Sequence, residues 1–133
     1  MRKTLLNTIL IVLAVPALPK LAAAQADADA SAEVERWLRQ LVNAQESYYV
    51  DHGTYTTDLA ALDLLSAARQ DSVWITVVQA GGRYWTATAG HRSARGKSCA
   101  IYVGLTDEIP AMPKTSDAEL SPKQEAVPVC DDF

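Results

Sequence analysis

Cysteine and histidine are both scarce in this sequence of 133 residues, since each occurs only twice. His52, His91, Cys99 and Cys130 lack the close paired spacing of a structural zinc site, so the sequence predicts no metal or other cofactor. A serine in a G-x-S-x-G turn is also missing, and neither histidine stands in a motif with a partner residue. A small hydrolase therefore has no motif to support it, and we expect a protein that is not an enzyme.

Acidic residues are missing from residues 1–24, which contain three of the twelve basic residues. The rest of the chain then has nine basic and sixteen acidic residues, a formal charge of −7, compared with −4 for the whole sequence. Nucleic acid and anionic membrane surfaces attract cations, so this charge disfavours both as partners. The length leaves room for one compact domain.

Residues 1–26 have the pattern of a secretory signal peptide. A basic start at residues 1–3 precedes a mostly apolar stretch at 5–18, and small residues then allow cleavage after Ala24 or Ala26. The alternative, an uncleaved anchor helix, is disfavoured because prolines and a lysine interrupt the apolar stretch short of the roughly 20 residues that cross a bilayer. We expect residues 27–133 to form one exported domain, periplasmic or extracellular, without a membrane span.

Export determines how the two cysteines are interpreted. Disulfides persist in oxidising compartments, so we expect a disulfide between Cys99 and Cys130. Closing a loop of about 32 residues would stabilise the fold by about 3–4 kcal/mol through loop-closure entropy. The alternative, a nucleophilic Cys99 with His91 as its base, has no orienting third residue to support it.

Apolar residues at spacings of three and four predict one amphipathic helix from Ser31 to Val50. Ser31 is the expected N-cap, and an Ala/Asp stretch at 25–32 is expected to be a flexible leader. Gly53 is the expected left-handed cap at the C-terminal end. The three tyrosines near this end are expected to pack together, with Tyr55 folding the following loop back onto the helix.

The period changes to two after residue 72. β-Branched and aromatic residues predict antiparallel strands at 73–78, 84–89 and 98–103, with Trp74 and Trp85 as a stabilising cross-strand pair. Four prolines after residue 104 disfavour further regular structure. The fold class is therefore predicted to be α+β: one N-terminal helix packed on a small antiparallel sheet of three to four strands, with a disulfide-bound C-terminal loop.

Residues 38–62 resemble a stretch of type IV pilins and type II secretion pseudopilins, at the end of their long helix. The shared pattern is a helical A-Q-E-x-Y-[FY], here residues 44–49, followed by a turn ending in G-x-Y, here 53–55, and by a Leu-rich segment. The similarity covers about residues 38–104, with looser agreement to 133. It implies a pilin-like globular head, and the two cysteines look like the C-terminal disulfide loop of that family.

The N-terminus departs from this family. Pilins are cut after a glycine that precedes a continuous apolar helix, whereas the first glycine here is Gly53, and prolines and the 25–32 leader are expected to break the helix. The resemblance therefore implies a head that does not enter a filament core. We expect an exported interaction protein that contacts a protein partner in a pilus-like or type II secretion-like assembly or at the cell surface. The alternative is a soluble periplasmic module that binds a small ligand or a polyanion.

Four residues are candidates for contacts with a partner. Trp37 lies early in the predicted helix, where a head without an anchor helix would expose apolar surface. Arg92, Arg95 and Lys97 lie in the loop at 90–98 of an otherwise acidic chain, which makes this loop a candidate for binding an acidic partner or a polyanion. The plainer interpretation, a solvated hairpin loop, stays open.

Overall fold

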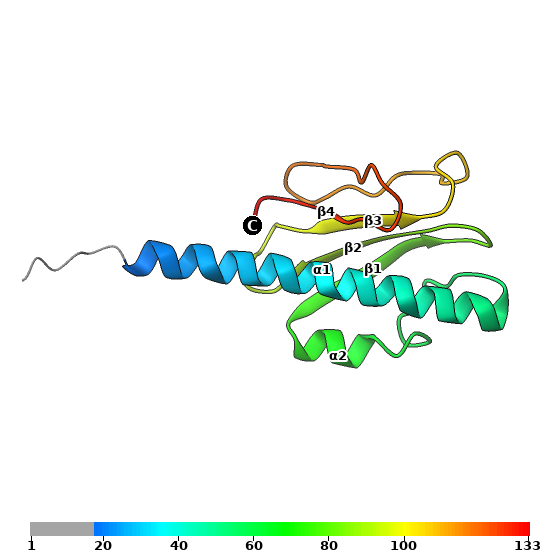
Figure 1. Cartoon of the computed structure of the whole chain (residues 1–133), viewed down its shortest axis with the longest axis horizontal. Helices are drawn as coiled ribbons and strands as arrows, with labels where there is room; N and C mark the ends of the chain where they lie inside the picture. Colours follow the sequence, from blue (N-terminus) through cyan, green and yellow to red (C-terminus); the bar gives the residue numbers. More distant parts are fainter. Residues whose placement is uncertain (1–17) are drawn as a thin grey trace, which may run out of the picture.

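The computed structural model describes residues 18–133. One long helix, α1 (Leu18–His52), lies along one face of a four-stranded antiparallel sheet (Figure 1). This arrangement confirms the predicted α+β class. The basic start and almost all of the apolar stretch of the predicted signal peptide lie outside the described residues, whereas Ala24 and Ala26 lie within the exposed first turns of α1.

The helix begins at Leu18, so the predicted N-cap at Ser31 and the flexible leader at 25–32 are wrong. Alanine has the highest helix propensity and fills most positions between 22 and 32. The amide of Gln25 also donates to Asp29 one turn later, at 2.9 Å.

The second part of α1 packs on the sheet, chiefly on the second strand. Val34, Leu38 and Leu41 are fully buried, at the spacings of three and four that the sequence predicts. At the C-terminal end, Gly53 adopts a φ of 70° and its N–H donates to the carbonyl of Tyr49 at 2.7 Å, which confirms the predicted left-handed cap.

The sheet has the order β1-β2-β3-β4. The strands are β1 (Val73–Ala80), β2 (Trp85–His91), β3 (Cys99–Val103) and β4 (Val129–Cys130). The three predicted strands are confirmed, with small shifts at their ends, and the two-residue β4 is an addition. β4 forms because the backbone around Cys130 pairs with that around Cys99.

The predicted contact between Trp74 and Trp85 is wrong. Trp74 lies opposite Gly90 and is 38 % exposed, whereas Trp85 lies opposite Ala80 and is fully buried. Side chains along a strand alternate between the two faces, so an odd offset along β2 places the two indoles on opposite faces of the sheet.

Two irregular regions complete the fold. Between α1 and β1, residues 58–63 form tight turns and are followed by the short helix α2 (Leu65–Gln70), which packs on β1. The sequence indicates a connecting region here with a short helical segment at 58–62, so the helix forms a few residues later than predicted. After β3, the chain lacks regular structure until β4 and is tied to β3 by the hydrogen bond from the Ala126 N–H to the Tyr102 carbonyl, at 2.9 Å. Ala100 and Tyr102 are both buried, although they alternate along β3 with the core residues Cys99, Ile101 and Val103.

Candidate functional site

The loop after α1 is held by two side chains of the A-Q-E-x-Y-[FY] motif. Gln45 is fully buried, and its amide makes two hydrogen bonds to the backbone of Thr56: Nε2 donates to the carbonyl at 2.6 Å, and Oε1 accepts from the N–H at 3.1 Å. Glu46 accepts a hydrogen bond from the hydroxyl of Tyr55 at 2.9 Å. Side chains of α1 therefore hold the loop in two ways: one hydrogen-bonds to the loop backbone at Thr56, and the other to the side chain of Tyr55.

Of the three tyrosines at this end of α1, Tyr49 and Tyr55 pack together as predicted, whereas Tyr48 packs on a histidine instead. The rings of Tyr49 and Tyr55 lie 4.8 Å apart, and Tyr48 stacks on His52 at 3.9 Å. Burial and the hydrogen bond to Glu46 raise the pKa of Tyr55 to about 12. Tyr55 is therefore a hydrogen-bond donor throughout the physiological pH range, and it holds the loop against α1.

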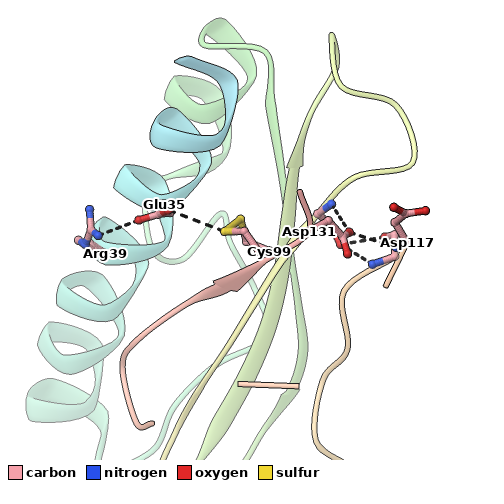
Figure 2. Close-up of a disulfide and its surroundings, with 8 residues drawn as sticks. Glu35, Arg39, Cys99, Asp117 and Asp131 are labelled. Carbon is pink, nitrogen blue, oxygen red and sulfur yellow. Dashed lines mark hydrogen bonds and ion pairs between the residues drawn. A yellow bond between two sulfur atoms is a disulfide. The ribbon is translucent and has the colours of Figure 1, made fainter. Parts of the chain in front are cut away.

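The C-terminal segment is tied to β3 by the predicted disulfide between Cys99 and Cys130 (Figure 2). The two cysteines are directly opposite each other in the β3–β4 pairing, with 4.0 Å between their Cα atoms. On the side of α1, Oε1 of Glu35 lies 4.0 Å from the sulfur of Cys130, and the carboxylate of Glu35 also forms an ion pair with Arg39 at 2.9 Å. The disulfide thus joins the C-terminal segment to β3 on the side of the sheet that faces α1.

Asp131, next to the disulfide, is a buried carboxylate that joins three parts of the chain (Figure 2). Its Oδ2 accepts from the N–H groups of Ser98 at 2.9 Å and Asp117 at 3.1 Å, and its Oδ1 accepts from the N–H of Ala118 at 2.9 Å. Its own N–H donates to the carbonyl of Ser98 at 2.9 Å. The carboxylate therefore fixes the turn at 115–118 against the start of β3.

Two opposing effects act on the pKa of Asp131. Burial raises it, but hydrogen bonds from Thr115, Ala118 and the other two backbone N–H groups outweigh burial and lower the pKa to about 2. Asp131 is therefore ionised in the folded protein at neutral pH, and its charge is stabilised by hydrogen bonds.

The anchored C-terminal segment carries a groove of about 630 Å³, formed by residues 119–124 and 127–129. Leu120 and Val127 line it and are 40 % and 45 % exposed, and Pro122 and Pro128 add further apolar surface. Lys123 and Glu119 bring one charge of each sign to its lining. An exposed, mainly apolar groove on a fixed segment is suited to bind an apolar side chain of a partner.

The three cations of the 90–98 loop have different surroundings. Lys97 forms an ion pair with Asp117, which raises the pKa of Lys97. Arg92 lines a pocket beside α2, and Arg95 is exposed. Among residues 18–133, Lys97 is therefore paired with a carboxylate, whereas Arg92 and Arg95 form no ion pair.

Trp37 is buried, with 4 % of its surface exposed, and it belongs to the core between α1 and the sheet. Its Nε1 donates to Oδ2 of Asp71 at 3.1 Å, and the guanidinium of Arg36 donates to the same oxygen at 2.7 Å. The hydrogen bond from Arg36, together with that from Trp37, holds the pKa of Asp71 below its ordinary value despite desolvation. The interpretation of Trp37 as an exposed contact is corrected: it ties α1 to the end of α2.

Sequence reasoning missed the roles of Gln45 and Asp131. A glutamine on the buried stripe of a helix is a signal for the first, because a buried amide needs hydrogen-bond partners. The second has only a weak signal, its position next to a disulfide-forming cysteine. Its amide partners lie 13 to 33 residues away in the sequence, and only the fold brings them together.

Within residues 18–133, no three His, Cys, Asp or Glu side chains gather as a metal site would require. None of the helices in this range is long and apolar enough to cross a membrane. Compared with known proteins, the chain matches no protein-family model and no curated protein sequence.

Proposed function

We propose that the chain is an exported, non-enzymatic interaction protein with a pilin-like head, which binds a protein partner of a pilus-like or type II secretion-like assembly, or of the cell surface, through the groove on its C-terminal segment. The resemblance of residues 38–62 implies a long helix, a loop packed on its end, an antiparallel sheet and a C-terminal disulfide loop. The order of elements from α1 to β4 agrees with that expectation.

The observation that carries the proposal is the fixation of an irregular segment around an exposed apolar groove. The disulfide and the buried carboxylate of Asp131 hold the segment at its end and at the 115–118 turn. The groove between these fixed points leaves Leu120 and Val127 exposed. A binding surface that is already ordered loses less conformational entropy when a partner binds, so fixation of this kind favours recognition.

Crosslinking in the native envelope tests the groove. The wild-type protein is compared with the double variant Leu120→Ser/Val127→Ser, and with Val50→Ser as a matched control at the end of α1, where Val50 is 83 % exposed. We expect the groove variant to lose a crosslinked partner that the wild type and the control retain. An identical set of crosslinked partners for all three proteins, or none for the wild type, would refute the proposal.

The mature N-terminus tests the export step separately. Intact mass measurement of protein recovered from outside the cytoplasm should give a chain that begins at Gln25 or Asp27. The groove lies about a hundred residues from these sites in the sequence, so cleavage leaves it intact. A full-length chain recovered only from the cytoplasm would contradict export and, with it, the proposed class of partner.

A further inference from the structure

A pocket of about 280 Å³ lies between α2, the turns that precede it and the start of β1. Ala68 of α2 and Val73 of β1 are 3 % and 1 % exposed, and they form its floor. Leu59, Leu64, Leu65 and Ile75 add apolar walls. This volume is slightly below the range of about 300–1,000 Å³ that is common for small-ligand sites, so the pocket has room for a group about the size of one large side chain.

Trp74 closes one side of the pocket and has a fixed position. Its indole lies directly against Gly90 on the neighbouring strand, because a Cβ added to Gly90 would lie only 2.5 Å from Cζ2 of Trp74. An aromatic side chain that covers a cross-strand glycine in this way keeps one face for packing and leaves the other accessible. Part of this large apolar side chain therefore stays exposed beside the pocket.

Arg69 and Arg92 are the two charged residues that line this pocket. They come from different elements, α2 and the loop after β2. Among residues 18–133, neither side chain forms an ion pair or a hydrogen bond, in contrast to Arg36, Arg39, Arg83 and Lys97, which pair with carboxylates. Other described cations, such as Arg95 and Lys123, also lack an ion pair, but Arg69 and Arg92 are the ones that line this pocket. These two cations are thus left without an anion in a chain that is acidic overall.

Two carboxylates close to α2 in the sequence form no ion pair with Arg69 or Arg92. Asp71 follows α2 but is bound by Arg36 and Trp37. Asp63 lines a neighbouring hollow together with Arg69 and forms no ion pair with it. A guanidinium is suited to bind a carboxylate through two parallel hydrogen bonds, and such a pair is stronger beside an apolar surface than in open water.

We propose that the pocket between α2 and β1 binds a small carboxylate that bears one apolar group. The carboxylate lies between Arg69 and Arg92, and the apolar group packs on Ala68 and Val73 beside the indole of Trp74. The same chemistry occurs in a free aromatic acid and in the C-terminal residue of a peptide. The pocket is separate from the C-terminal groove, so the two proposals stand or fall independently.

Binding of two acids and their neutral amides tests this proposal. Phenylacetate represents a free acid, and the tripeptide Gly-Gly-Phe represents a peptide end; phenylacetamide and Gly-Gly-Phe-amide keep the ring without the carboxylate. Methyl and indole NMR shifts report the site: those of Leu64, Leu65 and Trp74 should move, whereas those of Leu120 and Val127 should not. We expect a dissociation constant on the order of 1 mM for at least one acid, and about tenfold weaker binding of its amide. The acid that binds more tightly identifies the source of the carboxylate.

Charge-removing variants complete the test. Arg69→Ser and Arg92→Ser should each weaken binding of the acid about fivefold or more, whereas Arg95→Ser, in the same loop as Arg92 but outside the pocket, should leave it unchanged. Circular dichroism confirms that each variant is folded. The proposal is overturned if neither acid shifts the pocket resonances, if the amides bind as well as the acids, or if Arg95→Ser weakens binding as much as the two pocket variants.

Discussion

Replacing the buried carboxylate of Asp131 by an amide should destabilise the protein at neutral pH, and the loss should shrink in acid. Asp131→Asn keeps the size of the side chain but removes its charge, and it turns an NH₂ group toward backbone N–H groups that need an acceptor. The pKa of Asp131 falls from 3.8 to about 2 in the folded state. That shift corresponds to about 2 kcal/mol of stability at neutral pH, at roughly 1.4 kcal/mol for each pKa unit.

The direction with pH follows from the lowered pKa. A carboxyl group whose pKa is lower in the folded state stabilises the protein fully above its unfolded pKa, here 3.8, and this stabilisation is lost as the pH falls through about 2. The difference in unfolding free energy between the wild type and Asp131→Asn should therefore be constant from pH 7 to about pH 5. It should narrow by about 1 kcal/mol at pH 3 and by about 2 kcal/mol at pH 2.

Urea unfolding followed by tryptophan fluorescence measures this difference. With a urea dependence of roughly 1–3 kcal/mol per molar, the midpoint at pH 7 should fall by about 1–2 M. Asp132→Asn is the matched control, because it removes the same charge one residue later from an exposed side chain. Amide hydrogen exchange at Ala118 should become faster in Asp131→Asn only. Equal destabilisation by the two variants, or a difference that does not change between pH 7 and pH 2, would refute the reasoning.

Three further predictions concern the other parts that hold the fold together. Reduction of the disulfide should lower the free energy of unfolding by about 3–4 kcal/mol, measured by urea unfolding with and without reductant; a loss near zero would contradict a role in stability. Gln45→Ala should cost about 2–4 kcal/mol because it removes a fully buried side chain and leaves two partly buried backbone groups of Thr56 without their partners, whereas the half-buried Gln40→Ala should cost much less. Gly53→Ala should cost about 1–2 kcal/mol because of its φ of 70°, and Gly82→Ala, with open space around it and no positive φ, should be near neutral in thermal unfolding.

The parts of the fold that follow from local patterns could be predicted from the sequence. The buried stripe of α1, the glycine cap and the three main strands each depend on spacing within a few residues. The errors lie where two local signals compete. At 25–32 the acidic residues suggest a leader, but the helix propensity of alanine prevails, and α1 continues to Leu18.

The candidate sites depend more on the tertiary structure. The sequence indicates the cations of the 90–98 loop, but only the fold separates them, so that Lys97 pairs with Asp117 while Arg92 meets Arg69 across a pocket. Likewise, a tryptophan early in an amphipathic helix gives no sign of whether it faces a partner or its own core. In the folded protein Trp37 is buried in the core, and its indole N–H donates to Asp71, which follows α2.

The sequence by itself determined the period of the packed half of α1 and of the three main strands and, through the predicted export signal, the expectation of a disulfide. Only the tertiary structure decided which polar groups are buried and what satisfies them: the two hydrogen bonds of Gln45 to Thr56, and the three N–H groups around Asp131. The physical reason is that periodicity is a property of neighbouring residues. A buried polar group is stable only with partners that it meets after folding, and these partners lie far away along the chain.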